Sequence, residues 1–266
     1  MIRSALRLLS CLALGAVAPA AGAQTLSDIA EVVQVEVLPG WREADGRHVA
    51  GLSVRLAPGW KTYWRSAGSL GISPRIDWAG SRNLVAAQPV WPMPAVFREA
   101  DGLSVGYDAD FVLPVVVRPA DPSAPIRLRA SLDIGVCEAI CVPAHLELDA
   151  QLPGEGASDP AIVAALRDRP ERVRTAADCR IEPIENGVRL TAEIRMRPLG
   201  PGEAVMFELP DPSLWIGDAQ VARQGDRLVA TSEVYAQGGG LGLARGDVRI
   251  TAFADGAGVE LSGCRG

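Results

Sequence analysis

The sequence of 266 residues has only two histidines, and no serine, histidine and acidic residues can be placed in the arrangement that hydrolases use. It also lacks a glycine-rich loop of the kind that binds phosphate groups. Basic residues are fewer than acidic ones, 26 against 32, so the formal net charge is −6, and the arginines are scattered. Such a chain is a poor candidate for binding nucleic acid or an anionic membrane surface.

Long apolar runs are scarce too. Residues 8–17 form an apolar run that is too short to span a bilayer. Arg3 and Arg7 precede this run and a small-x-small cleavage site follows it, which predicts a secretory signal peptide of residues 1–23 and export to the periplasm. The alternative is a lipoprotein acylated at Cys11, which would leave a very short apolar region before the cysteine.

The mature chain would comprise residues 24–266 with a formal charge of −8, because the signal peptide contains two arginines. It has no second apolar stretch of about 20 residues, so we expect no membrane span. We also expect a monomer. The compartment permits disulfides among the four remaining cysteines.

Glycine and proline are abundant, with 28 and 20 residues, and they separate short strand-like runs throughout the chain. These runs are residues 29–40, 48–59, 110–120, 187–196, 203–209, 227–236 and 247–254. The pattern predicts an all-β protein made of β-sandwiches rather than an alternating βαβ fold.

One segment, residues 154–173, breaks the β pattern. Ser158 or Asp159 could cap a short helix there, with Pro160 in its first turn and its end near Arg169. We interpret this segment as a linker with a short helix. It would join an immunoglobulin-like domain of residues 24–153 to a second, smaller β-sandwich of residues 174–266.

Two of the cysteines, Cys179 and Cys264, bracket the second domain. A bridge between them would close a long loop, which is worth about 4–5 kcal/mol in the chain-entropy account of disulfides. We expect a structural disulfide, and elimination gives its pairing if the other two cysteines pair with each other.

The other two cysteines lie in IGVCEAICVPAHLEL, residues 134–148. The flanking runs alternate, with apolar residues at even positions and mostly polar residues at odd positions. A hairpin that turns at residues 138–140 places Cys137 opposite Cys141 and Asp133 opposite His145. Both cysteines would then lie at the hairpin tip, on the face that points away from the core.

Three interpretations of this pair remain open. A bridge that closes so few residues adds little stability, and an exposed, strained bridge is easily reduced, which favours a reactive dithiol–disulfide couple. A simple hairpin staple is the second interpretation. A metal site that uses Cys137, Cys141 and His145 is the third, and two thiolates would suit Cu(I). We expect His145 to pair with Asp133, although a protonated His145 close to Cys141 could stabilise a thiolate there.

Several motifs upstream add to the cysteine hairpin: residues 60–65 (WKTYWR), residues 91–94 (WPMP) and the Gly106-Tyr107 pair. Together with C-x3-C-x-P, and in this order, they resemble the N-terminal periplasmic domain of the DsbD and ScsB thiol:disulfide interchange proteins over roughly residues 30–150. The resemblance implies an immunoglobulin-like fold and thiol:disulfide oxidoreductase activity without a cofactor. It also implies that Cys137 and Cys141 are the active pair, with Cys141 as the nucleophile.

In that family a cap loop shields the active pair from stray oxidants. The resemblance places this loop at residues 97–102, with Phe97 and Glu99 as its site-lining residues. Ala100 stands where DsbD has an aromatic residue, so either Phe97 substitutes or the shielding is weaker. Tyr63 and Tyr107 either line the site or pack in the core.

The family also implies partners. A membrane-embedded domain passes electrons through a thioredoxin-like domain to the domain that this chain resembles. This sequence contains neither, so we expect a stand-alone chain that takes electrons from a membrane-embedded thiol reductant or exchanges with thioredoxin-like periplasmic proteins. The family is associated with copper tolerance and cytochrome c biogenesis, so a copper-binding function for this chain is one alternative. A non-catalytic immunoglobulin-like interaction module is the other.

Overall fold

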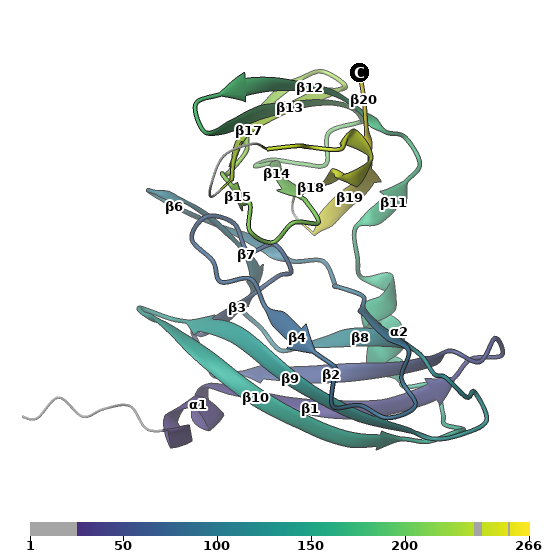
Figure 1. The fold of residues 1–266 in the computed structure, drawn as a ribbon. Helices are drawn as coiled ribbons and strands as arrows, with labels where there is room; N and C mark the ends of the chain where they lie inside the picture. The colour runs from purple at the N-terminus through teal and green to yellow at the C-terminus, as the bar shows by residue number, and fades with distance from the viewer. Residues whose placement is uncertain (1–25, 237–240, 255) are drawn as a thin grey trace, which may run out of the picture.

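The computed structural model describes residues 26–236, 241–254 and 256–266, so the expected signal peptide and Cys11 lie outside the described residues. The described chain is almost entirely β-structure, which confirms the predicted all-β class (Figure 1). It also contains two α-helices, α1 (Leu26–Val32) and α2 (Pro160–Arg167), and a 3-10 helix (Arg245–Asp247). Among these residues, no helix has the length and apolar character needed to cross a bilayer.

The first half of the chain forms two sheets. One has the strand order β1 (Val33–Arg42), β2 (His48–Leu56), β8 (Phe111–Arg118) and β5 (Ala86–Pro89). The other has the order β10 (Cys141–Leu152), β9 (Ile126–Cys137), β3 (Lys61–Tyr63), β7 (Gly102–Tyr107) and β6 (Ala95–Glu99), with β4 (Arg75–Asp77) also paired to β9. Leu52, Val115 and Leu128 are buried between the two sheets, as in a β-sandwich.

The second half forms two further sheets around a core of its own. One has the order β11 (Glu171–Val173), β19 (Ala257–Ser262), β18 (Arg249–Ala254) and β14 (Ala204–Glu208). The other has the order β15 (Trp215–Ile216), β17 (Arg227–Tyr235), β13 (Gly187–Arg195), β12 (Ala177–Ile184) and β20 (Cys264–Arg265), with β16 (Gln220–Gln224) paired to β17. These halves are called the first and second domains below.

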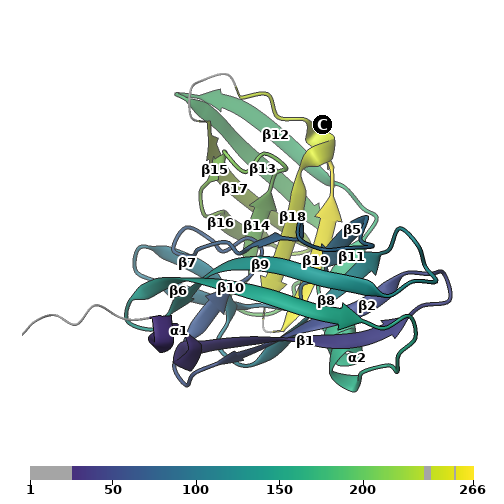
Figure 2. The ribbon, with the colours of Figure 1, turned by 60° about the horizontal axis from the view of Figure 1, so that its bottom comes forward.

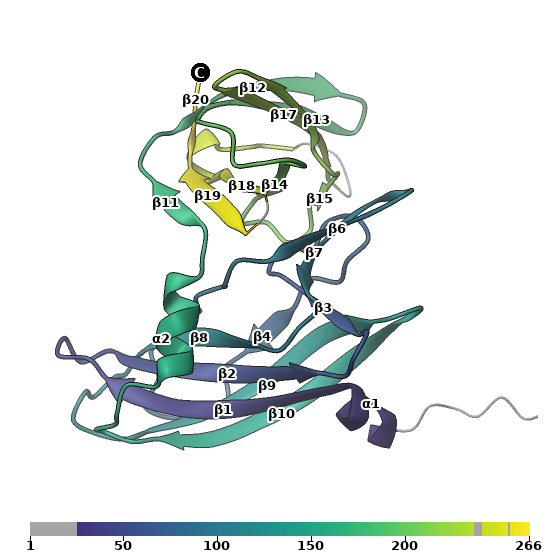
Figure 3. The same ribbon diagram turned by 180° about the vertical axis from the view of Figure 1, so that it is seen from behind.

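Helix α2 connects the two domains (Figure 3). It begins after Asp159, whose carboxylate accepts hydrogen bonds from the backbone N–H groups of Ala161 and Ile162, and it ends at Arg167, two residues earlier than the sequence suggests. Ile162 is fully buried against Gly51 of β2, where a Cβ atom would lie only 2.9 Å from the Ile162 side chain. The helix is therefore packed onto the first domain before the chain enters the second.

The domains also contact each other directly, on the side of the first domain that bears β6 and β7 (Figures 1 and 2). An apolar cluster joins Trp64 and Val105 of the first domain to Met206 and Phe253 of the second. The rings of Trp64 and Phe253 meet edge to face, with their centroids 5.1 Å apart. Such aromatic contacts add to the energy gained from burial alone.

Candidate functional site

The cysteine hairpin has the register that its alternating sequence predicts. Strands β9 and β10 pair without interruption from Ile126 opposite Leu152 to Cys137 opposite Cys141. The two cysteines form a disulfide across the hairpin tip. Strand pairing brings opposed Cα atoms close enough for such a bridge, so the local sequence alone positions this bond.

The two cysteines differ in exposure. Cys141 is exposed, but Cys137 is only 2% exposed, so the expectation of exposure is wrong for Cys137, although the register places it on the predicted face, away from the sandwich core. Residues 64–73, which we call the covering segment, cross the polar face of β9, and Ala67 packs on Cys137 together with Tyr63. The segment comes close because Gly135 has no side chain: a Cβ atom there would lie 2.7 Å from Ile72.

Tyr63 is in direct contact with the disulfide. Its hydroxyl donates a hydrogen bond to Cys137 Sγ at 2.7 Å and lies 3.4 Å from Cys141 Sγ. Burial, and to a smaller degree the negative charge of Glu99, raises the pKa of Tyr63. The hydroxyl therefore stays protonated at neutral pH and can stabilise negative charge on a sulfur atom.

Lys61 lies beside the pair, and sequence reasoning missed it. It is the cross-strand partner of Cys137, and its ammonium group is 3.1 Å from the Glu99 carboxylate and 5.1 Å from the centre of the Phe97 ring. The sequence does contain a feature that distinguishes this residue, because Lys61 is the single lysine of the chain. It also stands two residues before Tyr63, so both side chains point to the same face of β3.

Phe97 and Glu99 do not lie in a loop, contrary to the expectation. Both belong to β6, which forms a hairpin with β7, and the turn is at residues 100–101. Their contacts with Lys61 connect this hairpin to the strand next to Cys137. Whether the hairpin shields the pair stays a prediction.

Tyr107 and His145 do not contact the pair. Tyr107 is the cross-strand partner of Thr62, so it lies on the opposite face from Tyr63, stacks on Phe111 and donates its hydroxyl hydrogen to the carbonyl of Pro92. It is a core residue. Its burial raises its pKa well above the ordinary value.

His145 pairs with Asp133 at 2.6 Å, as the sequence suggests, and with Glu147 at 2.9 Å. These hydrogen bonds raise its pKa. It stands four positions from Cys141, about 13 Å along an extended strand, which is too far to contact that sulfur. In the described part of the chain, no group of three histidine, cysteine or acidic side chains is placed to hold a metal ion.

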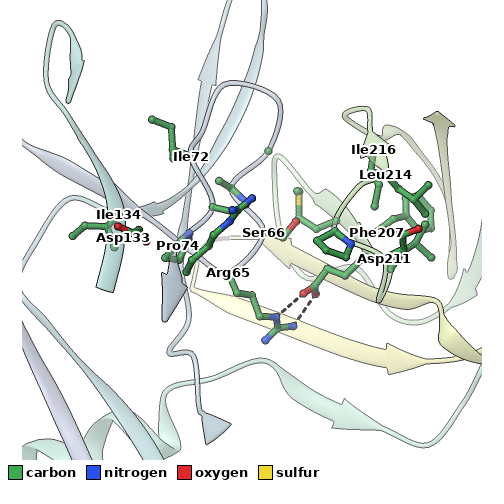
Figure 4. A pocket seen from close by; sticks show the side chains of 18 of the residues that line it. Arg65, Ser66, Ile72, Pro74, Asp133, Ile134, Phe207, Asp211, Leu214 and Ile216 are labelled. Carbon is green, nitrogen blue, oxygen red and sulfur yellow. Dashed lines mark hydrogen bonds and ion pairs between the residues drawn. The ribbon is translucent and has the colours of Figure 1, made fainter. Parts of the chain in front are cut away.

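A cleft of about 930 Å³ opens between the domains beside the hairpin. Asp133, Ile134, Ile72 and Pro74 line its first-domain side, and Arg65 lies at the boundary (Figure 4). Its second-domain lining consists of residues on and after β14, including Phe207, Asp211, Leu214 and Ile216.

The second disulfide, Cys179–Cys264, is in a different setting. It joins β12 to the C-terminal strand β20, and its cysteines are 85 residues apart in the sequence. Cys179 is buried in the core of the second domain. This bridge has no part in the Cys137 site.

Comparisons with known proteins agree with this architecture. Residues 31–153 match the family described as thiol:disulfide interchange protein DsbD, N-terminal. The fold is similar to the crystal structure of the N-terminal periplasmic domain of ScsB from Proteus mirabilis, with a TM-score of 0.62 and 23% identity over 88% of this chain and 92% of that chain. The similarity therefore extends into the second domain. No curated protein matches the chain.

Proposed function

We propose that this chain, which belongs through residues 31–153 to the DsbD N-terminal domain family, is a periplasmic protein that carries reducing equivalents through Cys137 and Cys141. One observation supports this most strongly: the disulfide has one exposed and one buried cysteine, and the buried sulfur accepts a hydrogen bond from Tyr63. In the Cys179–Cys264 bridge, by contrast, neither cysteine is exposed, since Cys179 is buried and Cys264 is half-buried.

In the proposed reaction, the thiolate of Cys141 in the reduced protein attacks a partner disulfide. A bond forms between Cys141 Sγ and one partner sulfur, and the other partner sulfur leaves as a thiolate. Cys137, after losing its proton, then attacks Cys141 Sγ, which releases the second partner thiolate and restores the Cys137–Cys141 bond. The partner gains two electrons and the pair is oxidised.

The site residues would assist these steps. The Tyr63 hydroxyl would stabilise a thiolate at Cys137. This thiolate attacks the mixed disulfide when the protein reduces a partner, and it is the leaving group when a partner reduces the protein. The positive charge of Lys61, next to Cys137 in the strand pairing, would act in the same sense. Phe97 and Glu99, held by Lys61, would limit the approach of small oxidants from the β6–β7 side.

The proposed partners are thioredoxin-like periplasmic proteins and a separate membrane-embedded thiol reductant, as family membership suggests. An exposed Cys141 suits both, because exchange requires in-line contact between sulfur atoms of two proteins.

Two measurements test the proposal. The potential of the Cys137–Cys141 couple should lie between about −270 and −120 mV, the range of thioredoxin-like proteins, whereas a value below about −300 mV would indicate a structural bridge. The Cys137→Ala variant should accumulate a mixed disulfide with a thioredoxin-like partner. The matched Cys141→Ala variant should not, and trapping by that variant instead would overturn the assignment of Cys141 as nucleophile.

A further inference from the structure

The covering segment has two sides. One side packs on Cys137 through Ala67 and on Gly135 through Ile72. The first domain holds the segment by backbone hydrogen bonds to β7, such as the one from Val105 N–H to the Ala67 carbonyl at 2.9 Å. The side chains of Arg65 and Ser69, however, bind the second domain.

Arg65 forms the first anchor. Its guanidinium donates to both carboxylate oxygens of Glu208, at 2.7 and 2.9 Å, and to Glu260 at 2.5 Å. All three side chains are mostly buried, with 16% of Arg65 and Glu208 and 6% of Glu260 exposed. Forked hydrogen bonds between charged groups fix geometry more strictly than single bonds do. Figure 4 shows Arg65 reaching across the domain boundary with its paired bonds drawn.

Asp218, from the second domain, forms the other anchor. Its Oδ1 accepts from the Ser69 N–H at 2.9 Å, and its Oδ2 accepts from the Ser69 hydroxyl at 2.5 Å and from the Leu103 N–H at 2.9 Å. This approach requires the glycine at position 102, where a Cβ atom would lie 2.4 Å from Ser69 Oγ and 2.9 Å from Asp218 Oδ2. One carboxylate thus joins the covering segment, β7 and the second domain.

Ala67, which covers Cys137, lies between these two anchors in the chain. We propose that the second domain limits access to Cys137 by holding the covering segment in place, with Glu208 and Asp218 as positioning residues. This inference rests on the proposed function only in taking the pair to be redox-active. With both anchors formed, an incoming thiolate meets Cys141 alone. Loss of an anchor lets the segment open locally and exposes Cys137 to attack as well.

The consequence concerns a defined reaction. An attacking thiolate forms a bond to one cysteine sulfur, the Cys137–Cys141 bond breaks, and the other cysteine leaves as a thiolate; a second thiolate from the same reductant then releases the mixed disulfide. Glutathione is a suitable probe because it is small enough to reach any exposed sulfur. A large partner protein has to approach Cys141, so its rate depends less on the covering segment.

The test uses the full mature chain and follows glutathione reduction of both disulfides by alkylation and mass spectrometry. In the Asp218→Ala variant, glutathione attack on Cys137, measured as the adduct on that cysteine, should be about fivefold faster, an effect of the size expected for losing one net hydrogen bond, while attack on Cys141 and reduction of Cys179–Cys264 are unaffected. Asp218→Asn keeps one accepting oxygen but presents an N–H donor to the donors that the other oxygen binds, so it should also accelerate attack on Cys137, by less than Asp218→Ala does. Glu208→Gln weakens the other anchor and should act in the same direction as Asp218→Ala.

Arg189→Ala is the matched control. Arg189 pairs with Glu233 inside the second domain and binds neither the covering segment nor the β6–β7 hairpin, so its loss should leave the rate of attack on Cys137 unchanged. Equal rates of attack on Cys137 in Asp218→Ala and wild type overturn the inference, as does equal acceleration by Arg189→Ala, which would indicate general loosening of the second domain. Failure of the proposed function is distinguishable, because the wild-type pair would then not exchange with any thioredoxin-like protein, whatever the Asp218 variants do with glutathione.

Discussion

The two disulfides of this protein join the same atoms in opposite settings. Cys137–Cys141 joins cysteines that are four positions apart at a hairpin tip. One of these cysteines is exposed, and the other accepts a hydrogen bond from a tyrosine hydroxyl. Cys179–Cys264 spans 85 residues, ties β12 to the last strand and lies partly in the core. Loop length and exposure, rather than the bond itself, make the first bridge better suited to exchange and the second better suited to stabilising the fold.

Removing each disulfide in turn should give reciprocal results, the largest effects that we expect. Cys137→Ala with Cys141→Ala should abolish exchange with thioredoxin-like partners and lower the free energy of unfolding by about 2 kcal/mol, whereas Cys179→Ala with Cys264→Ala should keep exchange and cost about 4–5 kcal/mol. Denaturant unfolding and an exchange assay measure the two quantities. Equal stability losses would remove the distinction between the bridges.

Substitutions of Tyr63 and Tyr107 should have smaller effects, and they test which contacts set the first bridge apart from the second. Tyr63→Phe removes the hydrogen bond to Cys137 Sγ, so exchange should slow by about tenfold, in line with a hydrogen bond to a group that becomes charged. Tyr107→Phe is the matched control, since its hydroxyl binds only the Pro92 carbonyl. It should lower stability by about 1 kcal/mol without changing the exchange rate. A slower rate in the control would mean that the site responds to general loss of packing.

His145 should give the smallest effect. Asp133 and Glu147 raise its pKa in the folded state, so its contribution to stability is complete below the unfolded pKa of about 6.5 and is lost as pH rises through the folded pKa. His145→Gln should therefore lower Tm slightly at about pH 5.5 and leave it unchanged at about pH 8.5. Exchange rates should not change at either pH. A change would mean that His145 acts on Cys141 despite its distance.

Local patterns made part of this structure predictable. Strand alternation predicts the hairpin register, because each cross-strand partner lies within the same 27 residues of β9 and β10. The Asp159 cap and Pro160 predict helix α2 for the same reason. The pairing of His145 with Asp133 follows from the register.

Contacts between distant segments were not predictable in this way. The burial of Cys137 comes from residues about 70 positions earlier, and no alternation within the hairpin records it. From the sequence, Tyr63 and Tyr107 are equally good candidates to line the site. Only the pairing of Thr62 with Tyr107 shows that the two tyrosines face opposite sides of the sheet. Lys61 had a local signal in its uniqueness, but its role depends on Phe97 and Glu99 from another hairpin.

The single lysine has a practical consequence. Apart from the amino terminus, Lys61 is the chain's only primary amine, and its side chain is 20% exposed beside the cysteine pair. Acylation of the Lys61 amine therefore measures how accessible this surface is, and it leaves the cysteines unaltered. A docked partner that covers the site would protect Lys61, and a broken Lys61–Glu99 contact would increase labelling. Labelling of Lys61 would thus report whether a partner occupies the surface at the disulfide end of the hairpin.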